Sequence, residues 1–380
     1  GVSLARRSAL RNPLSAIAMN LLIYAPQMAA YGGMERHLCL VAEAAAQAGH
    51  RTVLLTTSNS LAPEWRERLR TAGAELREMP AARGTAGGIA KAWWLLRQSL
   101  ALRRLRWDGV YTNGQGALAC LVWLAARAGN RRIHHHHTAA DAAEQATWTA
   151  GFRRVLAGAD ELVACSRFTA AQLDRATGRP GACFLPYLTE TAVQLPPPPA
   201  AQPPTGPLRF GFLGRLVPTK GIETILRLAA DPACDGIEWH IHGAGPDYPP
   251  ERFSGHAHLT YHGGYASPAQ QAVILAELDA VALFSIHNEG MPLSLIEAMA
   301  AGLPWVATAR GGTPELAESA ADCELVLHPE NYDECRAAVL ALAERIHDGQ
   351  TSRTAQRAVW ERRFAPVLVR RQWLEYLAKR

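Results

Sequence analysis

The amino-acid sequence predicts an α/β protein built from two Rossmann-like, doubly wound domains that face each other across a cleft. The chain has 380 residues, which is more than one hydrophobic core usually supports. Strand-like apolar runs alternate with helix-like stretches over residues 18–190, and the alternation restarts over residues 208–358. Such alternation is typical of parallel sheets covered by helices. Between the two domains, the proline-rich residues 191–207 are expected to form an extended linker.

Hydrophobic periodicity places the individual elements. In the first domain we expect strands at residues 20–25, 52–57, 109–112 and 162–164, and helices at residues 33–48 and 64–72. In the second domain we expect strands at residues 208–213, 237–242, near 259, 281–284 and 305–307. We expect its helices at residues 221–230, 268–276 and 293–301. Residues 359–380 have the pattern of an amphipathic helix that either caps the second domain or returns to the first. Open sheets bind ligands at the carboxyl ends of their strands, so the cleft is the expected site.

The composition indicates a globular cytoplasmic protein. Hydrophobic residues make up 48% of the chain and charged residues 19%, which is ordinary for a soluble domain. The seven cysteines are scattered without a CxxC pair, so reduced thiols are expected. No apolar run approaches the roughly 20 residues that a membrane-spanning helix needs. Residues 1–17 lack the apolar segment of a signal peptide.

Charge is distributed unevenly between the two halves of the chain. Residues 1–190 hold 23 Lys and Arg against 13 Asp and Glu, whereas residues 191–380 hold 16 against 21. In the basic half, residues 91–107 form an amphipathic pattern that includes Trp93, Trp94 and Arg103. We expect this helix to contact an anionic membrane surface, the alternative being a domain helix with a solvated basic face. No nucleic-acid-binding signature accompanies the charge, so no nucleic acid partner is expected.

The most informative segment runs from residue 285 to residue 302. A buried strand is expected to end in a polar loop, after which Pro292 opens a helix. Glu289 in the loop and Glu297 in the helix flank backbone amides that have no intrahelical acceptor. Those amides and the helix dipole favour an anion such as a diphosphate, and the carboxylates suit hydroxyl groups on either side of it. A diphosphate between two polyols is a nucleotide sugar.

Two glycine-containing loops of the second domain are further candidates. Arg215 and Lys220 lie in a loop between a strand and a helix, where a guanidinium and an ammonium can together hold a diphosphate. The alternative is that both are solvated surface cations. Gly243 ends the next strand and permits close approach of a base or ribose, although a plain turn explains it nearly as well.

The first domain offers weaker candidates. Gly32 and Gly33 precede its first helix and fit a loop that phosphate or sugar can approach. Four histidines occupy residues 134–137, and alternate ones would share a face of a strand. Zinc is disfavoured because no cysteine or carboxylate cluster completes a site. We expect instead that His137, beside Thr138, reaches the sugar.

Residues 288–302, with Glu289 and Glu297 separated by seven residues, resemble the Glu-x7-Glu signature of the retaining glycosyltransferases of family 4, which have the GT-B fold. Residues 32–33, 159–166, 214–221 and 243–246 also fall where that family places them. The likeness spans nearly the whole chain and is strongest over residues 208–316. It implies that the C-terminal helix crosses back to the N-terminal domain.

The resemblance also implies roles for the donor-binding residues. Arg215 and Lys220 would bind the donor diphosphate, together with the amides of Leu293 and Ser294. Glu297 would hold the ribose hydroxyls. The donor would be a nucleotide-diphosphate sugar of the UDP or GDP type.

For the sugar, the resemblance implies that Glu289 and the amides of Gly290 and Met291 contact the transferred group, with His137 beside it. Enzymes of the family need no metal and no cofactor. They retain the anomeric configuration by front-face attack, in which the leaving phosphate takes the acceptor's proton. That chemistry relies on stabilising the departing diphosphate and positioning the acceptor.

The expected function is therefore that of a retaining hexosyltransferase. The expected acceptor is a lipid-linked or polysaccharide precursor, such as one for lipopolysaccharide, at the inner face of the plasma membrane. Three alternatives are a GT-B-like sugar-nucleotide epimerase, a phosphorylase, and a non-catalytic nucleotide-sugar-binding subunit. Neither the sugar, the base, the linkage nor the oligomeric state follows from the sequence.

Overall fold

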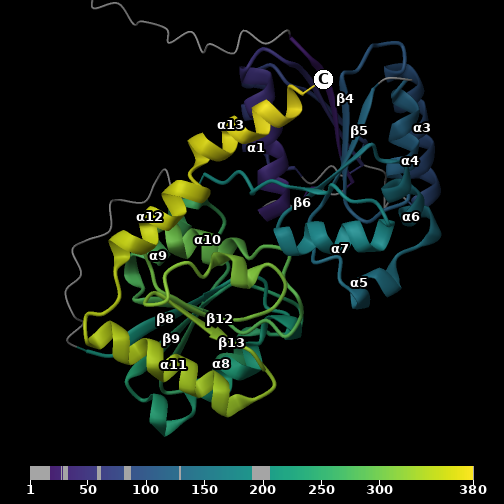
Figure 1. Ribbon diagram of the computed structural model, residues 1–380. Helices are drawn as coiled ribbons and strands as arrows, with labels where there is room; N and C mark the ends of the chain where they lie inside the picture. Colours follow the sequence, from purple (N-terminus) through teal and green to yellow (C-terminus); the bar gives the residue numbers. More distant parts are fainter. Residues whose placement is uncertain are drawn as a thin grey trace, which may run out of the picture.

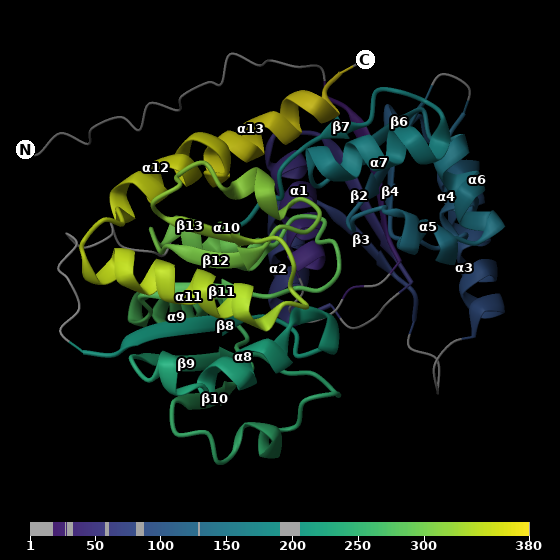
Figure 2. The ribbon, with the colours of Figure 1, turned by 60° about the horizontal axis from the view of Figure 1, so that its bottom comes forward.

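The computed structural model contains two parallel β-sheets, each flanked by helices (Figures 1 and 2). The structure describes residues 18–26, 28, 33–57, 61–80, 87–127, 130–190 and 206–379. Gly32 and most of the predicted linker, residues 191–205, lie outside these described residues. The predicted α/β fold of two Rossmann-like domains is confirmed.

The first sheet has seven parallel strands in the order β3-β2-β1-β4-β5-β6-β7. Its strands are β1 Asn20–Ala25, β2 Arg51–Thr56, β3 Glu75–Glu78, β4 Gly109–Asn113, β5 Arg131–His136, β6 Glu161–Ala164 and β7 Cys183–Phe184. Its helices are α1 Gly33–Gln47, α2 Pro63–Ala72, α3 Gly88–Leu102, α4 Ala119–Val122, α5 Ala142–Thr147, α6 Ala150–Gly158 and α7 Arg167–Thr177. The strand order reverses between β1 and β4, which places a binding crevice at their carboxyl ends.

The second sheet has six parallel strands in the order β10-β9-β8-β11-β12-β13. Its strands are β8 Leu208–Leu213, β9 Ile237–His242, β10 Leu259–Gly263, β11 Ala280–Leu283, β12 Trp305–Thr308 and β13 Cys323–Val326. Its helices are α8 Ile222–Ala229, α9 Pro268–Glu277, α10 Leu293–Ala300 and α11 Tyr332–His347. The order reverses between β8 and β11, and the loops that follow these two strands carry Lys220 and Glu289. Topology thus brings two distant motifs to one edge of the sheet.

The C-terminal region consists of two helices, α12 Arg353–Arg363 and α13 Pro366–Leu377, where the sequence predicted one helix over residues 359–380. The interruption coincides with Pro366, which has no backbone N–H and occupies the first turn of α13. Helix α12 packs on α10 of the second domain, and α13 packs on α1 of the first (Figure 1). The indole of Trp373 donates a 2.8 Å hydrogen bond to the carbonyl of Pro186. The predicted return of the chain to the N-terminal domain is therefore present.

Buried apolar residues fill both faces of the first sheet and form one core in the second domain. All seven cysteines are free, and five of them are buried. None of the described helices is long and apolar enough to cross a bilayer.

Candidate active site

Glu289 lies in the loop between β11 and α10 and is only 7% exposed. Its carboxylate accepts a 2.6 Å hydrogen bond from Nζ of Lys220 and another from the hydroxyl of Ser285. The ring of His287 lies 3.7 Å away. Burial opposes ionisation, but the charges of Lys220 and His287 and the two hydrogen bonds outweigh it and lower the pKa of Glu289. The side chain is therefore a fixed, ionised acceptor.

A set of backbone amides follows Glu289 in the chain and leads into the N-terminus of α10. Within the described part of the chain, these amides have no hydrogen-bond acceptor: Gly290, Met291, Leu293 and Ser294. The next two amides, of Leu295 and Ile296, both bond to the carbonyl of Pro292. Gly290 and Met291 are buried, and a buried amide without an acceptor is costly. This set, which we call the amide cluster, is suited to an anionic ligand.

Lys220 reaches Glu289 because its loop packs tightly against β11. It is the last residue of the short 3₁₀ helix Pro218–Lys220. The following Gly221 has a φ of 72°, and a Cβ there would lie 2.0 Å from the carbonyl oxygen of Phe284, so only glycine fits. Arg215, by contrast, is exposed and has no polar partner among the described residues. The two predicted phosphate-binding cations therefore differ: Lys220 is held in place, and Arg215 faces solvent.

Gly243 directly follows β9, beside the Arg215 loop. A Cβ at this position would lie 1.8 Å from the carbonyl oxygen of Gly214, so packing between the two loops requires glycine whether or not a ligand binds. The amide of Gly243 bonds to the carbonyl of Gly263 at 2.8 Å. Contact of Gly243 with a donor stays a prediction.

Glu297 is buried on α10 and contacts a residue of the other domain. One carboxylate oxygen pairs with Nη2 of Arg36 at 3.2 Å. The other accepts a hydrogen bond from the side-chain amide of Gln271. Arg36 lies in the first turn of α1, so the ion pair spans the two domains.

Close backbone approaches bring the domains together on both sides of the amide cluster. A Cβ at Gly33 would lie 2.3 Å from Cδ1 of Leu293, and a Cβ at Gly290 would lie 2.8 Å from the carbonyl oxygen of His137. The predicted glycine Gly33 therefore lies against the start of α10, and the predicted histidine His137 lies opposite the Glu289 loop. The structure brings these candidate residues to one interdomain boundary.

Polar contacts also join the domains. The side-chain amide of Asn288 donates a 2.6 Å hydrogen bond to Asp141. The carboxylate of Glu315, in the 3₁₀ helix Thr313–Leu316, accepts hydrogen bonds from the amides of Arg167 and Phe168 at 3.0 and 2.7 Å. Glu315 thus caps the N-terminus of α7 from the opposite domain.

The first three histidines of the run end β5 and His137 follows it, and the four rings alternate between the two faces, as predicted for a strand. His134 and His136 share one face, with ring centroids 6.4 Å apart. On the other face, the rings of His135 and His137 are 4.0 Å apart and lie near the ring of His37. Burial lowers the pKa of His37 and of His134 to about 3, and it lowers the pKa of His135 and His137 well below the usual value. These four imidazoles are neutral near pH 7.

His137 itself follows β5 and is half-buried. Its Nδ1 lies 3.1 Å from the hydroxyl of Tyr187, and the two rings stack with centroids 5.6 Å apart. Because burial and the neighbouring His37 keep the ring neutral, His137 can exchange hydrogen bonds with a sugar but does not supply a positive charge. Its contact with a sugar stays a prediction.

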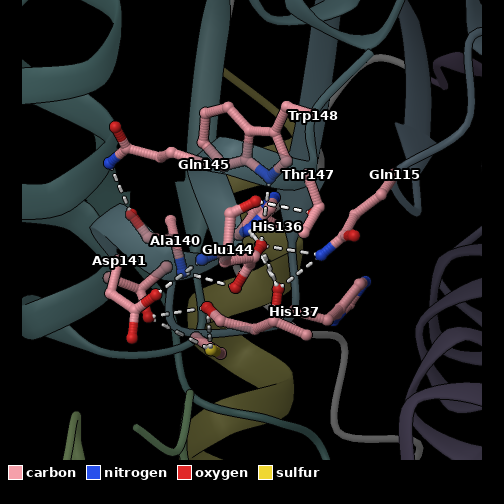
Figure 3. A network of polar contacts seen from close by, with 12 residues as sticks. Gln115, His136, His137, Ala140, Asp141, Glu144, Gln145, Thr147 and Trp148 are labelled. Atoms are coloured by element: carbon pink, nitrogen blue, oxygen red, sulfur yellow. Dashed lines mark hydrogen bonds and ion pairs between the residues drawn. The ribbon is translucent and has the colours of Figure 1, made fainter.

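His136 turns instead toward Glu144, at the centre of the network in Figure 3. Its Nε2 lies 2.7 Å from the carboxylate, which also accepts from the hydroxyl of Thr138 and the amide of Ala140. Burial opposes ionisation of Glu144, but these hydrogen bonds lower its pKa to about 2. Ala140 has a φ of 54°, a conformation that needs support from its surroundings in a non-glycine residue. Glu144 thus fixes the loop that presents Asp141 and the carbonyl of His137 to the second domain.

Among the described residues, no group of three His, Cys, Asp or Glu side chains is placed to hold a metal ion. Independence from metal remains a prediction about the reaction.

Several residues of the site were missed from the sequence. Ser285 and Gln271 hold the two glutamates, and Arg36 and Asp141 reach across from the first domain. Ser285 lies within the motif segment and could have been found there, because it directly precedes the loop. Arg36 and Asp141 could not have been found, because no sequence pattern links them to partners more than a hundred positions away.

Comparisons with known proteins agree with this arrangement. Residues 32–187 match the family model described as glycosyl transferase 4-like domain, and residues 207–345 match the model described as glycosyl transferases group 1. A Salmonella typhimurium protein, provisionally named the colanic acid biosynthesis glycosyltransferase WcaL, is 31% identical over 163 residues. That match covers 38% of this chain and 38% of the relative's length.

Solved structures share the fold over nearly the whole chain. Anabaena Alr3699/HepE in complex with UDP and glucose superimposes with a TM-score of 0.71 at 18% identity, covering 95% of this chain and 99% of that one. The lipopolysaccharide outer core galactosyltransferase WaaB superimposes with a TM-score of 0.69 at 16% identity, covering 94% and 99%. Fold and domain families together define a GT-B glycosyltransferase. This chain combines a glycosyl transferase 4-like domain with a glycosyl transferases group 1 domain.

Proposed function

We propose that the protein is a retaining, metal-independent glycosyltransferase that moves a hexose from a nucleotide-diphosphate sugar to a growing cell-surface glycan. The observation that carries this proposal is the amide cluster beside the Lys220–Glu289 pair. Amides without acceptors and a fixed ammonium suit a diphosphate, while Glu289 and Glu297 suit the hydroxyl groups on either side of it. The GT-B fold provides two domains to enclose such a donor.

The proposed reaction breaks the bond between the anomeric carbon and the β-phosphate oxygen and forms a bond from that carbon to the acceptor oxygen on the same face. The proton of the acceptor hydroxyl passes to the departing diphosphate. Lys220 and the amide cluster would stabilise the negative charge that develops on the leaving group. Glu289 would hold the sugar hydroxyls, and His137 would approach the sugar from the first domain. The retaining outcome rests on the resemblance of the Glu289–Glu297 segment to the Glu-x7-Glu signature.

The relatives support a UDP-type donor and a glycan acceptor. HepE was crystallised with UDP and glucose, WaaB is named for the lipopolysaccharide outer core, and WcaL is assigned to colanic acid biosynthesis. We therefore place UDP sugars ahead of GDP sugars and expect a lipid-linked or polysaccharide acceptor. No observation favours the epimerase, the phosphorylase or the non-catalytic subunit.

Helix α3 supplies a surface by which the protein would contact the membrane that carries such an acceptor. Ile89, Trp93 and Leu100 are 89%, 62% and 49% exposed on this helix, and Arg97 and Arg104 are exposed near them. Apolar side chains flanked by arginines complement a bilayer of anionic lipids, in which the apolar groups enter and the cations meet the headgroups. Trp94, which the sequence grouped with Trp93, is half-buried against the domain core instead.

Donor hydrolysis tests the proposed function without knowledge of the acceptor. The purified chain is incubated with UDP and GDP sugars, and release of the nucleoside diphosphate is measured with and without EDTA. We expect slow release from one donor, unaffected by EDTA, and a released sugar that has the anomeric configuration of that donor at early times. A protein that binds a donor but releases nothing from any of them would be a binding subunit instead.

A further inference from the structure

A buried ion pair between the two domains involves the residue expected to hold the ribose. The Arg36–Glu297 ion pair joins side chains that are 9% and 4% exposed. Gln271, from α9, donates to the second oxygen of the same carboxylate. One oxygen of Glu297 is thus bound by Gln271 of its own domain, and the other by Arg36 of the opposite domain.

This ion pair depends on closure of the cleft. Arg36 belongs to the first turn of α1 and Glu297 to α10, and the two helices meet where Gly33 lies against Leu293. If the domains separate, the ion pair breaks and both charged groups become hydrated. In the closed protein, neither charge can be buried at low cost without the other. Closure therefore forms the pair, and the pair favours closure.

We propose that Arg36 is a positioning residue that orients Glu297 toward the donor only when the domains are closed, an inference that rests on the proposed function. An ionised carboxylate offers about four acceptor positions. Holding Glu297 through Arg36 and Gln271 therefore does not by itself exclude ribose hydroxyls. Donor binding and domain closure then favour each other, because both use the same fixed carboxylate.

A competing role for Arg36, in which it blocks the donor, makes a different prediction. If Arg36 competed with ribose for Glu297, the ion pair would be autoinhibitory, and its removal would strengthen donor binding. Under the positioning role, its removal weakens binding of ligands that carry a ribose and leaves pyrophosphate unaffected.

A double-mutant cycle on the full chain separates these outcomes. Binding of UDP, GDP and inorganic pyrophosphate is measured calorimetrically for the wild type, Arg36→Met, Glu297→Gln and the double variant. We expect Arg36→Met to weaken binding of the preferred nucleoside diphosphate about tenfold. The double variant should bind this ligand as weakly as Glu297→Gln alone. Binding of pyrophosphate should be unchanged by Arg36→Met. Arg36→Lys keeps the charge and should lose less. The control is Arg66→Met, which removes a pair with Glu78 within the first domain.

The results also distinguish this inference from the proposed function. If the wild type binds a nucleoside diphosphate but Arg36→Met binds it equally well or more tightly, only the role of Arg36 is overturned. That role is also overturned if the losses from Arg36→Met and Glu297→Gln simply add. If the wild type binds neither UDP nor GDP, the proposed function fails and this inference fails with it. Small-angle X-ray scattering gives a second readout, because ligand-free Arg36→Met should be more extended than the wild type.

Discussion

Nζ of Lys220 lies 2.6 Å from Oε1 of Glu289, although 69 positions separate the two residues in the chain. The pair joins the loop after β8 to the loop after β11, the two strands at which the order of the second sheet reverses. An ammonium group has three donors, so Lys220 can hold Glu289 and still donate to a phosphate oxygen. A cation, a carboxylate and the amide cluster therefore come together at one edge of the second sheet, and a fixed arrangement of this kind lowers the cost of assembling a site.

Glu289→Gln should separate transfer from binding. The substitution keeps the shape of the side chain but removes the negative charge that, in the proposed function, holds the hydroxyls of the transferred sugar. We expect kcat to fall about 100-fold, a size typical of losing one electrostatic contact made in the transition state, while affinity for the free nucleoside diphosphate changes little. Glu361→Gln, on the exposed face of α12, is the matched control. An equal loss of diphosphate affinity would assign Glu289 to the phosphate rather than to the sugar.

Gly290→Ala should hinder closure of the cleft. The added Cβ would lie 2.8 Å from both Sγ of Cys165 and the carbonyl oxygen of His137, and the carbonyl belongs to the loop held by Glu144. We expect catalytic turnover to fall at least tenfold while the melting temperature stays within a few degrees of the wild type. Gly33→Ala is the comparison, since among the described residues its Cβ meets just the end of the flexible Leu293 side chain. Equal turnover in both variants would mean that the domains do not close as described.

Buried neutral histidines should make the protein sensitive to mild acid. The pKa of His134 is about 3 in the folded chain because of burial, whereas an unfolded histidine titrates near 6.5. The unfolded state therefore binds more protons below pH 6.5, and the free energy of unfolding falls as the pH drops from there toward 3. Each such histidine contributes up to about 1.4 kcal/mol per pH unit in this window.

His134→Leu should reduce that dependence. His134 lies on the face of β5 away from His137, so its replacement leaves the candidate site intact. Urea unfolding of both proteins between pH 7 and pH 5 measures the slope, with His347→Leu, exposed at the end of α11, as control. Parallel pH profiles for the wild type and His134→Leu would contradict a buried neutral His134.

Replacing Ile89 and Trp93 by serine should weaken association with anionic vesicles. Burying each of these side chains in a bilayer contributes roughly 1.5–3 kcal/mol, so the double variant should sediment with phosphatidylglycerol vesicles at least tenfold less. The control is Val367→Ser, which removes an equally exposed apolar side chain from α13. High salt should also reduce wild-type binding, because Arg97 on α3 and Arg104 just after it act through charge. Equal sedimentation of the double variant and the control would leave α3 as an ordinary surface helix.

Much of the fold could be predicted from the sequence because apolar runs and helical periodicity report burial directly. Glu289, the amides after it and Lys220 could be found for the same reason, since a strand, a loop and a helix start succeed one another within a short segment. The sequence could not show that Arg36 meets Glu297 or that Glu315 caps α7. Those contacts depend on how two separately folded domains approach, and no local pattern encodes that geometry. A single C-terminal helix is the wrong prediction because the amphipathic pattern continues through Pro366 and hides the break.

The presence of a diphosphate site in the second domain is tested most directly by calorimetry on the wild type and Lys220→Met. The ligands are uridine, UMP, UDP and the corresponding guanosine series. We predict that the wild type binds one diphosphate far more tightly than its monophosphate or nucleoside, and that Lys220→Met loses about 2–5 kcal/mol of that affinity. Arg215→Ala should show a loss in the same direction. If the diphosphate binds no better than the nucleoside, or if Lys220→Met binds it as the wild type does, the second domain does not hold a diphosphate at this site.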